Sequence, residues 1–215
     1  FLRHYLPLYR YIKGRGYIAI PSGNHDFARI RAGREPEDLK VAFAFLLTWP
    51  GVPFLYYGDE IGMRYLEDLP SKEGGYARTG ARTPMQWSRG RNAGFSTAPA
   101  KQLYLPIDPS ADRPDVASQE RDPGSLLHFV RRLTALRRSS PALQADGALR
   151  VLHAAQRGGP FVYLRSAGSE RFLVAINPSG RSVSATLPAV RLGSPQPVIE
   201  HGVKLSEVGR RIRVS

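Results

Sequence analysis

Two short apolar runs in the first quarter of the chain are each followed by a polar cluster. One is Tyr17–Ile20, and the other is Val52–Tyr57, which ends at Gly58. Such runs are typical of strands buried in a parallel sheet. Between them, residues 39–47 (LKVAFAFLL) are apolar nearly all round, which predicts a helix covered on most sides. Strand, helix, strand is an α/β pattern, and it places both polar clusters at the carboxyl ends of neighbouring strands.

The chain loses its periodicity from residue 64 to residue 122. This segment is rich in Gly, Pro, Arg and Asp, which predicts a long loop of the kind that often carries function. A helix is expected next, with Asp122 as its N-cap, Pro123 at its first position and its apolar residues between Leu126 and Leu136. Its apolar residues form one stripe, and its arginines lie on the other face and in the last turn.

After about Gly147 the pattern changes to alternation with a period of two, which predicts a small antiparallel β domain. The expected domains are therefore residues 1–146 and residues 147–215. The candidate strands are Leu149–His153, Phe161–Arg165, Arg171–Ile176, Ser182–Leu187, Val198–Glu200 and Arg211–Val214.

Composition narrows the class of protein only a little. The 215 residues are 42% apolar and 23% charged, as in an ordinary globular protein, and the net charge is +13. The arginines are scattered and form no basic stripe interleaved with aromatic residues, so solvated faces are expected rather than a nucleic-acid partner or an acidic protein partner. No apolar run is long enough for a membrane span, and the absence of cysteine excludes disulfides and thiolate metal sites.

Three motifs, in this order and spacing, carry a resemblance to a known family. They are Asn24-His25-Asp26, the run PGVPFLYYGDEIGM over residues 50–63, and the run ARTPMQW over residues 81–87. Together they resemble the C-terminal half of an α-amylase superfamily enzyme of glycoside hydrolase family 13. The third motif resembles the branch of oligo-1,6-glucosidases, α-glucosidases and trehalose synthases. The resemblance covers essentially the whole chain.

The resemblance implies an α/β fold of a particular kind. It is the C-terminal portion of a (β/α)8 TIM barrel, with strands seven and eight at the two apolar runs, followed by an all-β antiparallel sandwich domain. Active sites of such barrels lie at the carboxyl rim of the strands. This rim is where the sequence places Asn24-His25-Asp26.

The resemblance also implies roles for single residues. Asp26 would be the acid that stabilises the transition state, and His25 and Arg82 would bind the substrate sugar. The rigid fork of arginine can bind a carboxylate and a sugar hydroxyl together. The residues alone allow blander alternatives, namely a helix N-cap with a packed histidine around Asp26, and a surface loop arginine at Arg82.

Three further residues are expected to support the site. Asn24 would help set the turn, and Arg29 would either orient Asp26 or cap the loop. Glu60 and its neighbour Asp59 would be architectural, with their carboxylates satisfied by backbone donors and a nearby arginine. A catalytic pairing of Glu60 with Asp26 is the weaker alternative.

Tyr56 and Tyr57 are neighbours on the second predicted strand. Because successive side chains of a strand point to opposite faces, one ring should point into the barrel and the other toward its helices. Both are therefore expected to belong to the core.

Retaining hydrolysis of a glycoside needs a carboxylate nucleophile and a carboxylic acid about 5–5.5 Å apart. The resemblance places both upstream of strand seven, together with the calcium sites of the family, so no metal or cofactor is expected here. The implied function is part of a retaining α-glycoside hydrolase acting on α-linked gluco-oligosaccharides. The alternatives are intramolecular glucosyl transfer (maltose to trehalose) and a non-catalytic carbohydrate-binding or scaffold protein.

Two strands cannot close a barrel that needs eight. The remaining barrel segment is expected to come from the same polypeptide or from another chain, and the 215 residues alone are expected to be inactive. A cytoplasmic location is expected because the enzymes of the resembling branch are usually cytoplasmic.

Overall fold

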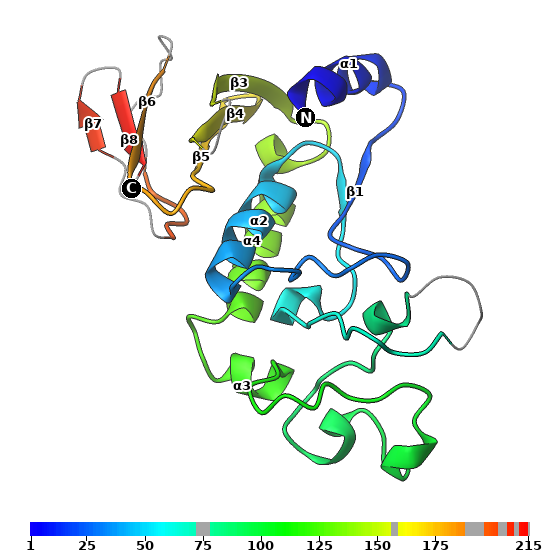
Figure 1. The fold of residues 1–215 in the computed structure, drawn as a ribbon. Helices are drawn as coiled ribbons and strands as arrows, with labels where there is room; N and C mark the ends of the chain where they lie inside the picture. Colours follow the sequence, from blue (N-terminus) through cyan, green and yellow to red (C-terminus); the bar gives the residue numbers. More distant parts are fainter. Residues whose placement is uncertain (72–77, 156–158, 188–195, 202–205, 209–210, 215) are drawn as a thin grey trace. The chain divides into compact units, whose positions relative to one another are not determined.

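The computed structural model describes residues 1–71, 78–155, 159–187, 196–201, 206–208 and 211–214 (Figure 1). The chain divides into two compact units. The first unit contains Phe1–Ile18, Val41–Val52 and Leu133–Ser215. The second contains Ala19–Lys40 and Pro53–Arg132. The domain boundary expected between residues 146 and 147 stays a prediction.

The two apolar runs form short strands of one two-stranded sheet, β1 (Ala19–Pro21) and β2 (Val52–Phe54). The N–H of Val52 donates to the carbonyl of Ile18, and that of Ser22 to the carbonyl of Phe54, both at 2.8 Å. Because the partner advances as the chain advances, the strands are parallel, as predicted. Both strands are shorter than expected, and Phe54 is 57% exposed.

The predicted helix between the strands is confirmed as α2 (Pro36–Thr48). It begins at a proline, followed by two acidic residues in the first turn, which complement the positive end of the helix dipole. Leu39 and Phe43 are fully buried, as expected of a helix that is apolar nearly all round. The helix ends before Trp49-Pro50, because the residue that precedes a proline is disfavoured in the helical region.

The first unit is organised around Trp49, which is completely buried. Its ring lies among aromatic rings from α1 (Leu2–Ile12) and its flank, from α2 and from strand β4 (Phe161–Ala167), with centroid distances of 5.0–5.6 Å. The neighbours are Phe1, Tyr5, Phe45, Phe161 and Tyr163. The residue that terminates α2 thus becomes the centre of an aromatic core.

Helix α4 (Leu126–Ser139) confirms the second predicted helix, but its N-cap differs from the prediction. Ser125 occupies the cap: its carbonyl accepts from the N–H of Phe129 at 3.0 Å, and its Oγ accepts from the N–H of His128 at 3.4 Å. Asp122 instead accepts from the N–H of Gly124 at 2.8 Å and shapes the turn before the helix. Asp and Ser are both common at helix N-caps and in turns, so residue type alone did not show which of the two caps the helix.

Among the described residues the expectation of solvated arginines is wrong at Arg29, Arg137 and Arg165, which are buried. Arg137, in the last turn of α4, donates to the carbonyls of Leu47, Trp49 and Gly51 at 2.8, 3.0 and 2.6 Å. It satisfies carbonyls that the end of α2 leaves without a helical partner. Burial lowers the pKa of Arg137.

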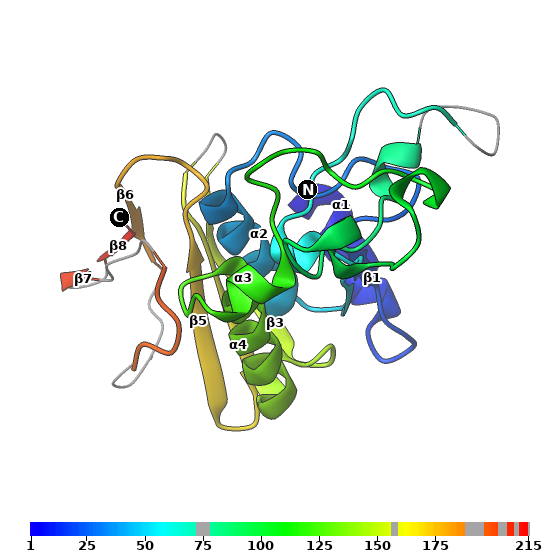
Figure 2. The same cartoon turned by 90° about the horizontal axis from the view of Figure 1, so that it is seen from below.

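The C-terminal part of the first unit contains two three-stranded antiparallel sheets (Figures 1 and 2). One has the order β3-β4-β5 and the other β6-β8-β7. Their strands are β3 (Ala148–Ala154), β4, β5 (Glu170–Ile176), β6 (Val183–Thr186), β7 (Ser206–Val208) and β8 (Arg211–Val214). A buried apolar cluster joins Leu152, Val162 and Leu164 to Ala185 and Leu187.

Five of the six predicted strands in this region are present. The exception is Val198–Glu200, which forms no strand. It follows Pro197, which lacks an N–H for a sheet ladder, and Val198 is 57% exposed. Strand β7 was not predicted.

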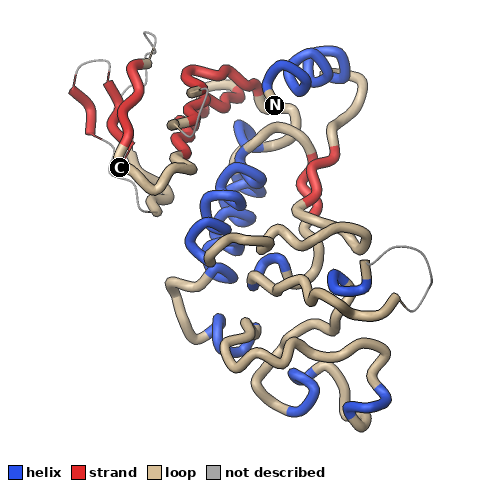
Figure 3. Tube along the Cα trace, viewed as in Figure 1, coloured by secondary structure: helices blue, strands red, loops and turns tan. Residues whose placement is uncertain are grey.

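Most of the second unit is loop, and loops are drawn in tan in Figure 3. Within the predicted long loop lie the short helix α3 (Val116–Glu120) and the 3₁₀ turns η2 (Thr79–Ala81), η3 (Arg91–Gly94) and η4 (Ala100–Gln102). Two further 3₁₀ turns are η1 (Asp59–Ile61), after β2, and η5 (Pro141–Leu143), in the first unit. A buried cluster of Ile61, Met63, Met85 and Leu127 ties this loop to the start of α4.

Candidate active site

The Asn24-His25-Asp26 motif forms a turn directly after β1. The side-chain oxygen of Asn24 accepts a hydrogen bond from the backbone N–H of Asp26 at 2.7 Å. This is an Asx turn, in which the amide side chain substitutes for a backbone carbonyl. This bond is compatible with the turn-setting role proposed for Asn24.

The carboxylate of Asp26 lies against two arginines. Its Oδ1 atom is 2.8 Å from Nη1 of Arg78 and 3.1 Å from Nη2 of Arg82. Both arginines flank the 3₁₀ turn η2, with Arg78 before it and Arg82 after it. The structure thus brings together Asp26 and Arg82, which are 56 residues apart in the sequence.

His25 lies on the other oxygen of the same carboxylate. Its Nε2 atom is 3.4 Å from Oδ2 of Asp26, and its side chain is 62% exposed. The backbone carbonyl of His25 accepts from Nε of Arg82 at 3.0 Å. Thus the histidine ring faces solvent beside the acid, while its backbone is tied to the arginine.

Two opposing effects act on the acid. Partial desolvation tends to raise the pKa of Asp26, but the charges and hydrogen bonds of His25, Arg78 and Arg82 outweigh it and hold that pKa below its ordinary value. Asp26 is therefore a carboxylate throughout the neutral range. A fixed negative charge is what stabilises a positively charged transition state.

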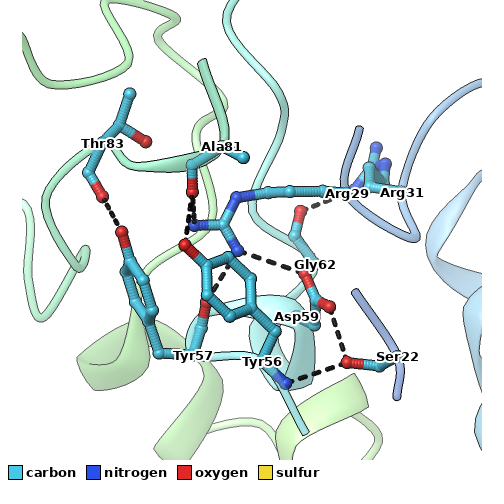
Figure 4. A network of polar contacts seen from close by, with 9 residues as sticks. All are labelled: Ser22, Arg29, Arg31, Tyr56, Tyr57, Asp59, Gly62, Ala81 and Thr83. Atoms are coloured by element: carbon cyan, nitrogen blue, oxygen red, sulfur yellow. Dashed lines mark hydrogen bonds and ion pairs between the residues drawn. The ribbon is translucent and has the colours of Figure 1, made fainter. Parts of the chain in front are cut away.

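Arg29 lies three residues after Asp26, and its side chain is buried. Figure 4 shows it between Tyr57, Asp59 and Ala81. Its guanidinium donates to the carbonyl of Tyr57 at 2.6 Å, to that of Ala81 at 2.9 Å, and to Oδ1 of Asp59 at 3.1 Å. Among the described residues none of these contacts is to Asp26, which favours the loop-capping role over the orientation of Asp26. Because Ala81 directly precedes Arg82, the bond also constrains the backbone of the substrate-binding candidate.

Tyr56 and Tyr57 do not point in opposite directions, contrary to the prediction. The strand ends at Phe54, so the alternation that the prediction assumed does not reach them. Both rings lie over the guanidinium of Arg29, with centroid distances of 5.0 and 4.9 Å. Their hydroxyls donate to the carbonyls of Ala81 at 3.2 Å and Thr83 at 2.8 Å (Figure 4).

The acidic pair after β2 lies apart from the Asp26 carboxylate. Asp59 accepts from Ser22 Oγ at 2.7 Å and pairs with Arg29; burial raises the pKa of Asp59, and these two partners oppose the rise. Burial also raises the pKa of Glu60, and hydrogen bonds from the backbone at Glu60 and Gly58 oppose the rise. Among the described residues neither carboxylate contacts Asp26, which favours the architectural interpretation.

Sequence reasoning missed Arg78 and the joint role of the two tyrosines. A signal for Arg78 was present, because the dipeptide Arg-Thr occurs at residues 78–79 and again at residues 82–83. No local pattern indicates that both arginines meet one carboxylate. The contact between Arg78 and Asp26 forms only because the fold brings together residues 52 positions apart in the sequence.

The described residues contain neither a cluster of metal-ligating side chains nor a helix that could span a membrane. Within these residues, no three His, Asp or Glu side chains lie together so that they could hold a metal ion. None of the helices in the described part combines the length and apolar character that crossing a bilayer requires.

The chain resembles several known proteins. The family model described as "Alpha amylase, catalytic domain" matches residues 7–146. A trehalose synthase from Thermus thermophilus is 40% identical over 154 residues, covering 67% of this chain and 15% of that protein. A probable alpha-glucosidase from Rhizobium meliloti is 33% identical over 186 residues, covering 79% of this chain and 33% of that protein.

The fold itself has solved relatives. The trehalulose synthase MutB from Pseudomonas mesoacidophila has a TM-score of 0.74 and 24% identity, with 96% of this chain and 43% of that chain covered. At this identity the likeness concerns the fold alone. The chain spans less than half the length of each of these three relatives.

Proposed function

Because the chain belongs to the alpha-amylase catalytic-domain family, we propose that it forms part of a retaining enzyme that acts on α-linked gluco-oligosaccharides. The predicted resemblance is thereby confirmed, and the fold is consistent with part of an α/β barrel. We also propose that the two antiparallel sheets after residue 147 form the β-sandwich domain that follows such a barrel.

The observation that carries the proposal is the Asp26 carboxylate between Arg78, Arg82 and His25. A pre-ionised acid held in fixed geometry suits stabilisation of an oxocarbenium-like transition state. The exposed ring of His25 beside it can donate to sugar hydroxyls, and Arg82 can bind a hydroxyl while it holds Asp26. Asn24, Arg29 and Glu60 support this arrangement through the turn, the buried ion pair and the end of β2.

Two reactions are compatible with this site. Hydrolysis and intramolecular glucosyl transfer share the covalent glycosyl intermediate and differ in whether water reaches it. Glucosyl transfer is the second candidate, and sequence similarity supports it. The trehalose synthases among the relatives match this chain at 40–46% identity, and the glucosidases match it at 27–33%. The least supported alternative is a non-catalytic carbohydrate-binding protein, since that function requires no pre-ionised acid.

The nucleophile and the acid of the reaction are proposed to come from further barrel segments, of the same polypeptide or of another chain. Two strands alone cannot close a barrel, and β2 leaves Phe54 57% and Leu55 39% exposed. These apolar side chains offer a surface on which neighbouring strands could pack.

The experiment uses the natural protein that contains this chain, given maltose and isomaltose, with products resolved by chromatography. Glucose alone indicates hydrolysis, trehalose from maltose indicates transfer, and binding without turnover indicates the non-catalytic alternative. Asp26→Asn should lower kcat by at least about 10²–10³-fold. The control is Asp112→Asn, which removes a 78% exposed carboxylate that pairs with Arg64. A normal rate for Asp26→Asn would exclude Asp26 from the mechanism.

A further inference from the structure

The two oxygens of the Asp26 carboxylate have different surroundings. Oδ1 accepts from Arg78 at 2.8 Å and from Arg82 at 3.1 Å. Among the described residues, the contact of Oδ2 is the exposed ring of His25 at 3.4 Å. Because a carboxylate oxygen has two lone pairs in its plane, Oδ1 is fully used by the two guanidinium groups, and Oδ2 keeps its capacity to accept from a ligand.

The two arginines reach Asp26 from a turn whose backbone is held independently of it. Thr79, Gly80 and Ala81, which form the turn η2, are all buried. The carbonyl of Gly80 accepts from the N–H of Leu66 at 3.3 Å, and a Cβ at Gly80 would lie only 2.0 Å from the carbonyl oxygen of Leu66. The arginine positions are therefore set by the packing of η2.

Both arginines bond to the Asp26 carboxylate. Arg82 also donates to the carbonyl of His25, so it touches both His25 and Asp26. Arg78 donates to Oδ1 at 2.8 Å, and its side chain is 26% exposed. Through this bond Arg78 acts on the orientation of the Asp26 carboxylate.

We propose that Arg78 is a positioning residue that holds Oδ1 of Asp26 so that Oδ2, beside His25, is the oxygen presented to the sugar. This inference rests on the proposed function of Asp26. It adds a residue and an atom to that function: Arg78 determines the rotation of the carboxyl plane, and Oδ2 is the acceptor for a substrate hydroxyl.

The test compares Arg78→Gln with Arg131→Gln in the natural protein, with maltose as substrate. Arg131 is a suitable control because it also pairs with a carboxylate, that of Glu120, but at a site where both side chains are about half exposed. Arg78→Gln should lower kcat about 10–100-fold with a smaller change in KM, since misplacing a reacting group by about 1 Å can cost 10²-fold. Arg131→Gln should match the unmodified protein.

A pH profile separates positioning from a purely structural effect. Arg78 favours the ionised form of Asp26, so its loss should raise the pKa of Asp26 and move the acid limb of kcat/KM to higher pH. Arg78→Lys keeps the charge but loses the fork, so its acid limb should stay near the original while kcat remains reduced. It also provides the test if Arg78→Gln does not fold.

The outcomes distinguish this inference from the proposed function. If Arg78→Gln, or Arg78→Lys in its place, equals Arg131→Gln in kcat and in the acid limb while Asp26→Asn is inactive, the inference about Arg78 is wrong and the proposed function stands. If Asp26→Asn turns over normally, the proposed function fails, and the inference fails with it.

Discussion

The guanidinium of Arg29 and the carboxylate of Asp59 lie 3.1 Å apart, and both side chains are completely buried. Two charges removed from water gain little net stability from each other, but the loss of one leaves the other buried without compensation. Here the pair also carries bonds to the carbonyls of Tyr57 and Ala81. It therefore joins the end of β2 to the loop that presents Arg82.

Arg29→Met should lower the free energy of unfolding by about 3–5 kcal/mol, because it leaves Asp59 charged and buried. Urea denaturation followed by tryptophan fluorescence would measure the change. Arg131→Met, which breaks an exposed pair, is the control and should cost at most about 1 kcal/mol. Equal costs for the two variants would show that the buried pair is not the support that its contacts indicate.

Gly80→Ala should destabilise the protein by about 1–3 kcal/mol, because the added methyl group would overlap the carbonyl of Leu66 and displace the backbone. The same displacement would move Arg78 and Arg82, so kcat should fall as well. The control is Gly180→Ala, at a position with open space around the new Cβ, where a change within about 0.5 kcal/mol is expected. A thermal melt and a rate measurement suffice, and an unchanged kcat for Gly80→Ala would contradict the prediction.

Adjacent arginines in the last turn of α4 provide a matched pair. Arg137→Met should cost about 3 kcal/mol, because three buried carbonyls lose their donor. Arg138→Met, at an exposed neighbour, should change stability by less than about 0.5 kcal/mol. Denaturation midpoints of the two variants would decide, and similar midpoints would remove Arg137 from the support of the α2 terminus.

Alkaline pH should test the burial of Tyr56. Desolvation, reinforced by Tyr57, raises the pKa of Tyr56 from 10.0 to about 12. A phenol of this kind contributes stability that is fully present below its unfolded pKa and is lost as pH rises through its folded pKa. Tyr56→Phe should therefore reduce the loss of unfolding free energy between pH 10 and about 12.

Denaturant titrations over that pH range would measure the slope for the two proteins. At about pH 8 the phenol is protonated in both the folded and the unfolded state, so the two slopes should agree there. An unchanged slope above pH 10 in Tyr56→Phe would mean that the Tyr56 phenol is as well solvated in the folded protein as in the unfolded chain.

The parts of the fold that sequence predicted are those encoded by neighbouring residues. The proline and acids at the start of α2, the apolar run of β2 and the period of two in β3, β4 and β5 each report a local backbone preference. The same reasoning failed at Asp122 and Ser125, where two good capping residues compete. It also failed at Val198, where a β-branched residue follows a proline.

The site shows the same division. Asn24, His25 and Asp26 are contiguous, so the sequence could indicate their turn and its place at the end of a strand. The directions of Tyr56 and Tyr57 depended on where β2 ends, and the buried Arg29 is bonded to the carbonyl of Ala81, 52 residues away. Those features depend on long-range contacts, which hydrophobic periodicity and secondary-structure propensity do not predict.

By itself the sequence determined the helices α2 and α4, most of the C-terminal strands, the family, and an acid at position 26 at the edge of a sheet. Only the tertiary structure decided which charges surround that acid, which of its oxygens Arg78 and Arg82 occupy, and which arginines are buried. The physical reason is range: backbone preferences act over a few residues, whereas hydrogen bonds and ion pairs form only when the folded chain brings distant side chains within about 3 Å of one another.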